Sequence, residues 1–291
     1  MMLIGKSPMH VNQTLGSNFS NTRVKGYYNN LTQKVNIEPK WLKSEDIINI
    51  LQENGEYVIF PVAVFQYALG CYDLFIETRL EKYKFTFLKY ANWTFDNQDE
   101  KGRWDNFSFV YPEAPYGAMA QGEGVSVLVR AYLLTEDVRY LESAKKSLDF
   151  MLRDVKDGGT TSYENKRVIF LEYTNQSVVM NGWIFAWWGL FDYVLLTSDN
   201  GKYKQILDKS LDSLVEMLPN FRNAYWSLYD LDGKLASPFY HNLHIAQMEA
   251  MFQLTSNVVF DEYAKRWRKQ QHTFLNKFFA FIVKAIQKIR E

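Results

Sequence analysis

The chain has 291 residues, enough for one large domain or two small ones, and 47% of them are hydrophobic, which excludes disorder over most of its length. Lys plus Arg (33) equal Asp plus Glu (33), so the chain lacks the basic surplus of nucleic-acid-binding proteins, and no nucleic-acid partner is predicted. The aromatic share of 16% suits a helical core or a cleft for carbohydrate, because sugar faces stack on rings.

The first segment, 1–40, is rich in Asn, Ser, Thr and Gly and has no sustained period. It is predicted to be an extended arm that packs on the following domain, 41–291, or on a neighbouring subunit of a homodimer. The amino terminus has neither the charged lead nor the apolar core of a secretory signal, so we expect a cytoplasmic protein.

Helical signals begin at Ser44 and stop at Asn54, and a long apolar helix is predicted over 57–78, with Pro61 in its first turn. Its length approaches that of a membrane span. Polar residues such as Asp73 interrupt it, however, which favours a buried helix of a soluble protein. Cys71, the single cysteine, can form no internal disulfide and is predicted to be a small buried hydrophobe.

A repeat of roughly 60 residues follows, marked by tyrosines that open amphipathic helices. The tyrosines are Tyr83, Tyr140, Tyr203 and Tyr263. The predicted helix pairs are 57–78 with 80–94, 117–134 with 137–153, 178–197 with 201–217, and 240–255 with 258–285. Repeated pairs of one buried and one half-exposed helix build either an open solenoid or a closed toroid. The fold class is therefore all-α.

Three long loops, 95–116, 154–177 and 218–239, lead into the more apolar helices, whereas the turns inside each pair are short. In a toroid such loops gather at one end, which makes that end the functional face. The second loop places Glu172 and Tyr173 just before an almost wholly apolar helix. They are either ordinary loop residues beside a helix capped by Ser177, or an acid/base pair at the mouth of a cavity.

The first loop ends at Tyr116, and a Gly- and Ala-rich helix start follows with Gln121 and Glu123. Its small residues allow either a ligand or another helix to come close. The third loop carries Tyr229 and leads to Tyr240. Four tyrosines, with Glu172, are thus directed to the predicted functional face.

His241 and His244 are spaced i, i+3, so they share one face of a helix. A zinc site would need a third ligand, and no HExxH pattern or comparable cluster is present, so no metal is predicted. These histidines are expected either to form hydrogen bonds in the core or to hold a sugar. The sequence also lacks a dinucleotide fingerprint, and no cofactor is predicted.

At the level of motifs, the chain resembles the carboxy-terminal domain of the heparan sulfate D-glucuronyl C5-epimerases. The matching blocks keep their order and include Tyr116-Gly-Ala-Met-Ala-Gln-Gly-Glu-Gly124, Leu171-Glu-Tyr-Thr, Val179-Met-Asn-Gly182, Ser227-Leu-Tyr-Asp-Leu231 and Tyr240-His-Asn-Leu-His-Ile-Ala-Gln247. It looks like a bacterial-type homologue without the β-rich domains of the animal enzymes. The resemblance covers roughly residues 95–270.

The resemblance implies an α/α toroid and an active site with a Glu-Tyr pair and further tyrosines. In this numbering the implied catalytic residues are Glu172, Tyr173 and Tyr240. The residues implied or expected to bind the substrate are Tyr116, Gln121, Glu123, Asn181, Tyr229, His241 and His244. Where the family has an arginine after the Tyr-Asp-Leu motif, associated with holding an acidic chain, this sequence has Asp232.

The chemistry expected is C5 epimerisation of a uronic acid residue in a saccharide, by removal of a proton from one face and its return to the other. Glu172 with Tyr173 would serve one face and Tyr240 the other, while His241, Tyr116 or Tyr229 holds the carboxylate. Three alternatives stay open: a uronate lyase, an inverting glycosidase using Glu172 with Glu123 or Asp232, and a saccharide-binding module without turnover.

The last segment, from Phe274 to Arg290, alternates apolar residues with lysines. A basic amphipathic helix of this kind can lie on a membrane surface or pack against the toroid or a partner subunit. Membrane contact would be consistent with a lipid-linked glycan as substrate.

Overall fold

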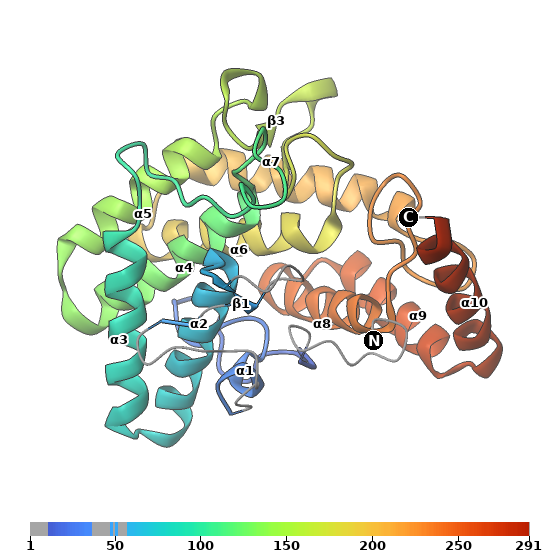
Figure 1. Cartoon of the computed structure of the whole chain (residues 1–291), viewed down its shortest axis with the longest axis horizontal. Coiled ribbons are helices and arrows are strands. Elements are labelled where there is room, and N and C mark those ends of the chain that lie inside the picture. The colour runs from blue at the N-terminus through green and yellow to red at the C-terminus, as the bar shows by residue number, and fades with distance from the viewer. Residues whose placement is uncertain (1–10, 37–46, 49, 52–56, 291) are drawn as a thin grey trace.

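The computed structural model describes residues 11–36, 47–48, 50–51 and 57–290, with the side chains of 50–51 and 288–290 excepted (Figure 1). Most of the helix expected from Ser44 onward falls outside these residues. Where the segment is described, Ile50–Leu51 (β1) pairs antiparallel with Tyr57–Val58 (β2), so this part of the prediction was wrong. The long helix α2 begins at Pro61 rather than at residue 57, and the proline lies at its first position, where it is tolerated.

Eight of the helices form four pairs, in which one member is largely buried and the other is buried along one face. The buried members are α2 (Pro61–Thr78), α4 (Ala118–Thr135), α6 (Met180–Thr197) and α8 (Pro238–Thr255). Their partners are α3 (Glu81–Asp96), α5 (Val138–Met151), α7 (Lys202–Met217) and α9 (Val258–His272). Each buried helix packs on the next, which makes an α/α toroid with inner and outer helices and confirms the predicted fold class.

The repeat extends to the way the inner helices end. Each has 18 residues and finishes with a threonine whose Oγ1 donates to the carbonyl four residues earlier, at 2.6 to 2.8 Å. The next residue is left-handed, with φ between 53° and 58°; these residues are Arg79, Glu136, Ser198 and Ser256. A left-handed residue ends a helix by turning the chain away from the axis. The short turns of the four pairs therefore share one backbone device.

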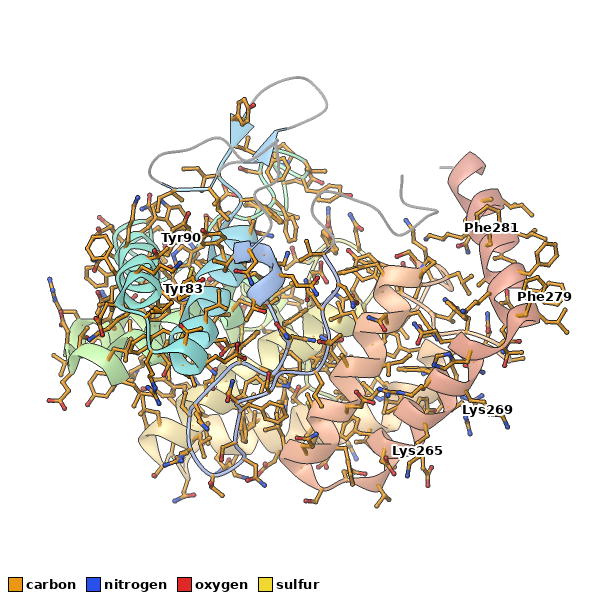
Figure 2. All side chains as sticks on the ribbon, turned by 90° about the horizontal axis from the view of Figure 1, so that it is seen from below. Tyr83, Tyr90, Lys265, Lys269, Phe279 and Phe281 are labelled. Atoms are coloured by element: carbon orange, nitrogen blue, oxygen red, sulfur yellow. The ribbon has the colours of Figure 1, made fainter. Side chains whose placement is uncertain are left out.

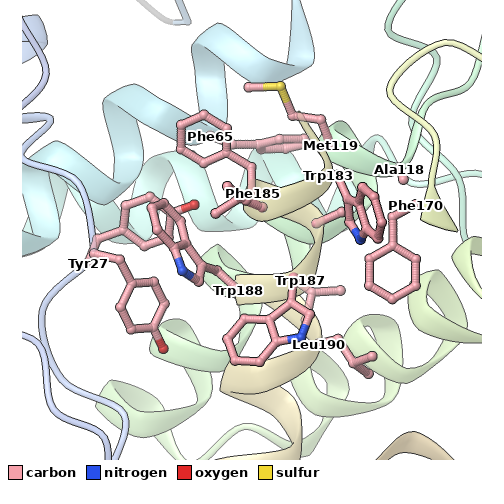
Figure 3. Close-up of a cluster of buried hydrophobic side chains, with 14 of the residues drawn as sticks. Tyr27, Phe65, Ala118, Met119, Phe170, Trp183, Phe185, Trp187, Trp188 and Leu190 are labelled. Atoms are coloured by element: carbon pink, nitrogen blue, oxygen red, sulfur yellow. The ribbon is translucent and has the colours of Figure 1, made fainter. Parts of the chain in front are cut away.

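The core is richest around α6, the predicted apolar helix. Trp183, Trp187 and Trp188 are all buried, and Figure 3 shows them among Tyr27, Phe170 and other apolar side chains. Two of the indoles also donate hydrogen bonds to the outer helix α7, Trp183 to Ser210 Oγ at 2.8 Å and Trp187 to the Leu207 carbonyl at 3.0 Å. A buried indole N–H needs such a partner, so these bonds fix the inner helix against the outer one.

The amino-terminal arm closes the open side of the toroid. Within it, α1 (Thr32–Asn36) packs on α2. The arm reaches all four inner helices: the Tyr27 N–H donates to Asp73, Lys25 and Gly26 carbonyls accept from Arg130, Tyr28 donates to Asp192, and Asn12 accepts from Asn242. The arm thus packs on its own domain, as one of the two expectations had it. The predicted boundary at residue 40 lies outside the described residues.

Short elements shape the second long loop. Thr161–Ser162 (β3) pairs antiparallel with Ile169–Phe170 (β4), in the register Thr161 with Phe170. Single turns of 3-10 helix at Val155–Asp157 and Glu164–Lys166 lie on either side of β3, and a third at Leu218–Phe221 follows α7. The hairpin delivers the chain to Glu172, two residues after β4.

The last helix, α10 (Phe274–Arg290), lies beside α9 and turns much of its apolar surface outward. Phe274, Phe278, Phe279 and Phe281 are all at least 49% exposed, and Figure 2 shows Phe279 and Phe281 on the outside of the helix. Contact of this surface with a membrane or a second subunit stays a prediction. Within the part of the chain that is described, no helix has both the length and the apolar character to cross a bilayer.

Candidate active site

The three long loops are joined by backbone hydrogen bonds at one end of the toroid. The Ala118 N–H, just after the first loop, donates to the Leu171 carbonyl at 2.7 Å. The third loop contacts the second through an isolated β-bridge between Val179 and Asp230, and the Leu231 N–H donates to Val178 at 3.2 Å. The second loop is therefore the central one, and Glu172 and Tyr173 lie between its two neighbours.

A cleft of about 490 Å³ opens at this end, within the usual size range of small-molecule sites. Four phenols line it: Tyr111, Tyr173, Tyr229 and Tyr240. The other polar residues of its wall are Asn175, Gln176, Ser177, Asp230, Asp232, Lys234, Ser237 and Lys284. Such a mixture of aromatic faces, hydroxyls and charges suits a saccharide.

Three of these phenols lie close together. The Tyr173, Tyr229 and Tyr240 phenols are close enough to shift one another's pKa, and the rings of Tyr229 and Tyr240 have centroids 4.7 Å apart. Phe107 and Tyr111 from the first loop pack on the ring of Tyr173, with centroid distances of 4.6 and 5.8 Å. Burial, and after it the charge of Glu172, raises the pKa of all three linked phenols above 10. They are therefore proton donors at neutral pH.

Glu172 lies behind Tyr173, only 6% exposed, and accepts a hydrogen bond from its phenol. Burial raises the pKa of this carboxyl to about 7, and the Tyr173 hydrogen bond lowers it in part. Its Oε2 has no hydrogen-bond partner among the described residues. A buried carboxyl that titrates near neutral pH can both take up and release a proton, which is the property required of an acid/base group.

Two glycines make room for Glu172. A side-chain carbon on Gly182, at the start of α6, would overlap the Glu172 carboxyl group, and one on Gly117, just before α4, would overlap its backbone carbonyl. Any other residue at these places would displace Glu172 from the end of the toroid. Gly117 of the first matching block and Gly182 of the third are thus explained by close approach.

The chain matches a known protein family over more than half of its length. The family model described as the D-glucuronyl C5-epimerase C-terminus matches residues 92–269, more than half of the chain. The chain belongs to the D-glucuronyl C5-epimerase C-terminus family. This confirms the family expected from the motifs, and the matched span begins in α3 and ends in α9.

Two relatives place the chain within this C5-epimerase C-terminus family. It is 28% identical over 220 residues to the D-glucuronyl C5-epimerase of Caenorhabditis elegans, which covers 66% of this chain and 36% of the relative. It is 30% identical over 159 residues to the uncharacterized protein MJ1128 of Methanocaldococcus jannaschii, covering 53% of this chain and 51% of the relative. The chain thus spans between about a third and a half of the length of these relatives.

Solved structures agree with the toroid fold of the C5-epimerase C-terminus. The cellobiose 2-epimerase from Spirochaeta thermophila matches with a TM-score of 0.53 at 9% identity, covering 92% of this chain and 79% of that one. An unsaturated glucuronyl hydrolase specific for heparin matches with a TM-score of 0.52 at 10% identity, covering 84% and 81%. At such low identity the likeness concerns the fold alone.

Within the C5-epimerase domain, the structure brings together Glu172, Tyr173, Tyr229 and Tyr240, but not Tyr116. The Tyr116 ring packs edge-on against Phe150 of α5, with centroids 5.4 Å apart, and under the Arg103 guanidinium at 4.3 Å. Its backbone borders Glu172 through Gly117, yet its side chain points to the outer layer. Tyr116 thus lies outside the cleft lining, and its expected carboxylate-binding role stays a prediction.

Three polar residues of the inner helices are buried, and Glu123 Oε2 and Asn181 Oδ1 have no hydrogen-bond partner among the described residues. Gln121 is fully buried and exchanges hydrogen bonds with the Trp104 backbone and Ser147. Glu123, also fully buried, accepts from Gln66 at 2.9 Å, and burial raises the pKa of its carboxyl to about 8. Asn181 is 3% exposed, and its carbonyl accepts from Gln247. None of the three lines the described cleft, and their expected role in binding the substrate stays a prediction.

His241 and His244 of α8 lie in the core. Both rings are fully buried and share Ser227 Oγ, at 2.8 and 3.0 Å from their Nδ1 atoms. His241 also stacks on Trp226 with 3.7 Å between centroids, and burial lowers its pKa to about 3. Of the two expectations for these histidines, hydrogen bonding in the core is the one that their position supports. No group of residues suited to a metal ion occurs in the described part of the chain.

Sequence reasoning missed Tyr111 and the two cleft lysines, Lys234 and Lys284. Tyr111 lies five residues before Tyr116, and the loop sequence does not indicate which of these two tyrosines faces the cleft. Lys284 comes from α10, beyond the family match, and only the packing of that helix brings it to the site.

Proposed function

We propose that this protein is an enzyme that inverts C5 of a uronic acid residue in a saccharide, using Tyr173 backed by Glu172 on one face of the sugar and Tyr240 on the other. The single observation that carries the proposal is the grouping of the buried Glu172 with the cleft-lining phenols Tyr173, Tyr229 and Tyr240, which shift one another's pKa values. Membership of the family and the likeness to sugar-processing toroids support it.

In the first step, the C5 proton passes to the Tyr173 oxygen while Tyr173 gives its own proton to the Glu172 carboxylate. The electron pair of the C5–H bond moves into the uronate carboxyl group, forming an enediolate. With a pKa of about 7, a large share of Glu172 is ionised at neutral pH and can accept the proton. This explains why a carboxyl shielded from the cleft by a phenol can still serve as the base.

In the second step, Tyr240 donates its phenolic proton to the opposite face of C5 and the carboxylate re-forms. Its raised pKa makes Tyr240 a stable acid at neutral pH, suited to protonating a carbanion-like carbon. The enzyme is then left with a protonated Glu172 and a Tyr240 phenolate. The Tyr173 and Tyr229 phenols return the proton from one to the other, so every proton is accounted for.

The test is exchange of the C5 proton with solvent. After equilibration in heavy water Tyr240 carries deuterium, so incubating the protein with a glucuronate-containing oligosaccharide should label C5, detected by mass spectrometry and proton NMR. Glu172→Gln should abolish labelling, because glutamine cannot accept the proton. A fully active Glu172→Gln variant would sink the assignment.

The same experiment separates the alternatives. A uronate lyase shares the first step but expels the 4-O group, so it would yield an unsaturated product with new ultraviolet absorbance. A glycosidase would release reducing sugar. A binding module would bind the oligosaccharide and leave C5 unlabelled. Any of these three results, without labelling of the intact saccharide, contradicts the epimerase proposal.

A further inference from the structure

The reaction proposed above has an electrostatic requirement that its phenols and carboxyl do not meet. A uronate carries a negative charge, and a second one develops on its carboxyl group as the C5 proton leaves. A fixed positive charge beside that group stabilises the transition state. The two cleft carboxylates, Asp230 and Asp232, act in the opposite sense.

The described cleft wall contains two cations, Lys234 and Lys284. Lys234 follows the tight turn at Gly233, where its N–H donates to Asp230 Oδ1 at 3.0 Å. Burial raises the pKa of the Asp230 carboxyl, and this hydrogen bond and the Lys234 ammonium offset part of the rise. Lys234 is thus turned toward the acidic side of the cleft. Lys284 approaches from a different element, the helix α10.

Residues of α10 before and after Lys284 hold this lysine in place through their own contacts. Its Nζ donates to the Leu235 carbonyl at 2.9 Å, and Leu235 itself lines the cleft. One turn earlier, Ala280 is buried against Trp226 and Leu235. Almost one turn later, Gln287 Oε1 accepts from the Leu235 N–H at 3.1 Å. Residues spaced in this way share one helix face, so α10 holds the lysine against the cleft wall.

The segment of the cleft wall that contacts Lys284 begins at Leu235 and leads to Tyr240, the proposed acid. Ser237, two residues after Leu235, caps α8 by accepting from the Tyr240 N–H. Leu235, Ser237 and Tyr240 all line the same cleft. An ammonium has three donors, so it can keep the Leu235 carbonyl while donating to a ligand.

We infer that Lys284 forms a carboxylate subsite of the cleft, which holds the uronate through a charged hydrogen bond. The inference rests on the proposed function for its choice of ligand. It assigns a substrate-binding role to α10, which lies outside the family match at residues 92–269. Without α10 the cleft would keep its phenols and lose the Lys284 ammonium.

The test compares Lys284→Gln, Lys284→Arg and a matched control, Lys277→Gln, an exposed lysine two turns earlier on the same helix. Calorimetry with the full-length protein measures Kd for a glucuronate-containing oligosaccharide and for its carboxyl-reduced, neutral form. Lys284→Gln should weaken binding of the charged ligand roughly 10-fold or more, the loss expected for one charged hydrogen bond, and leave the neutral ligand unchanged. The arginine variant and the control should stay within about 3-fold of wild type.

A second measurement separates a charge effect from a packing effect. The wild-type Kd for the charged ligand should weaken with added KCl, and this salt dependence should decrease in Lys284→Gln. Equal losses for charged and neutral ligands, or an unchanged Kd for both, would overturn the subsite. So would a wild-type protein that fails to bind the charged ligand.

The results also distinguish this inference from the proposed reaction. Selective loss of charged-ligand binding in Lys284→Gln, with no C5 labelling by the wild type, would support the subsite and refute the epimerase. Labelling by the wild type together with unchanged binding and labelling in Lys284→Gln would refute the subsite and leave the epimerase standing.

Discussion

Two buried carboxyl groups, Asp192 and Glu172, differ in how completely the protein satisfies them. Asp192 on α6 is fully buried, and its oxygens accept from Arg130, Tyr28 and Ser126 at distances of 2.6 Å. Glu172 is almost as deeply buried, but it has the Tyr173 phenol on one side and an Oε2 without a hydrogen bond among the described residues. No cation of the described structure is paired with it.

This difference separates a structural group from a reactive one. Asp192 is paired with Arg130 and accepts hydrogen bonds on both oxygens, so it joins α4, α6 and the arm and has no capacity left for chemistry. Glu172 is held at a cost in free energy, since an unpaired buried carboxylate is disfavoured and its pKa rises. Groups held in this way are found where proton transfer is needed.

The largest effect on stability is expected from a substitution of Asp192, the carboxylate whose oxygens both have hydrogen-bond partners. Asp192→Asn leaves Arg130 buried without its counter-charge, which should lower the free energy of unfolding by about 3–5 kcal/mol. Chemical denaturation measures the change. Asp208→Asn serves as the control, because its pair with Lys204 is exposed and should contribute less than about 1 kcal/mol. Equal effects in the two variants would mean that the buried cluster does not hold the arm.

A smaller effect of opposite sign is expected at Glu172. The folded pKa of about 7 lies above the ordinary value of 4.5, so between these pH values the unfolded chain ionises first and wild-type stability falls as pH rises. Glu172→Gln removes this loss. The variant should match the wild type below pH 4.5 and gain up to roughly 3 kcal/mol relative to it above pH 7. Denaturation series at several pH values measure this, and parallel profiles for the two proteins would contradict it.

The smallest change in stability is expected from removing the hydroxyl group of Tyr229. Tyr229→Phe removes the phenol that shifts the pKa values of Tyr173 and Tyr240, which should cost about 1 kcal/mol of stability and slow C5 labelling about 10- to 100-fold. Tyr203→Phe is the matched control, since its phenol donates to Asp149 between two outer helices. If both variants keep full labelling, Tyr229 is not on the route by which the proton returns.

Sequence patterns were sufficient for the repeat and for part of the site. The alternation of apolar and amphipathic helices predicted four pairs, because a helix buried all round must be covered by partners. The length difference between loops and turns predicted one functional end. Glu172, Tyr173, Tyr229 and Tyr240 were selected from these loops, and the structure places them together.

The other site residues expected from the sequence do not line the cleft, because the position of a residue in the sequence does not define the direction of its side chain in the folded chain. The i, i+3 spacing of His241 and His244 defines a shared helix face, but the packing of Trp226 and Ser227 decides that this face looks into the core. Tyr116 directly precedes the glycine that borders Glu172, yet its ring turns to Phe150.

By itself, the sequence determined the family, the helix pairs and the identity of the acid/base candidates, because local periodicity and motif chemistry are written in neighbouring residues. Only the tertiary structure decided that the arm fills the open side of the toroid, that Glu172 lies unpaired behind Tyr173, and that α10 brings Lys284 to the cleft. The contacts of the arm and of α10 join residues far apart in the chain, 164 positions for Tyr28–Asp192 and 49 for Lys284–Leu235, so they depend on packing energy rather than on local pattern.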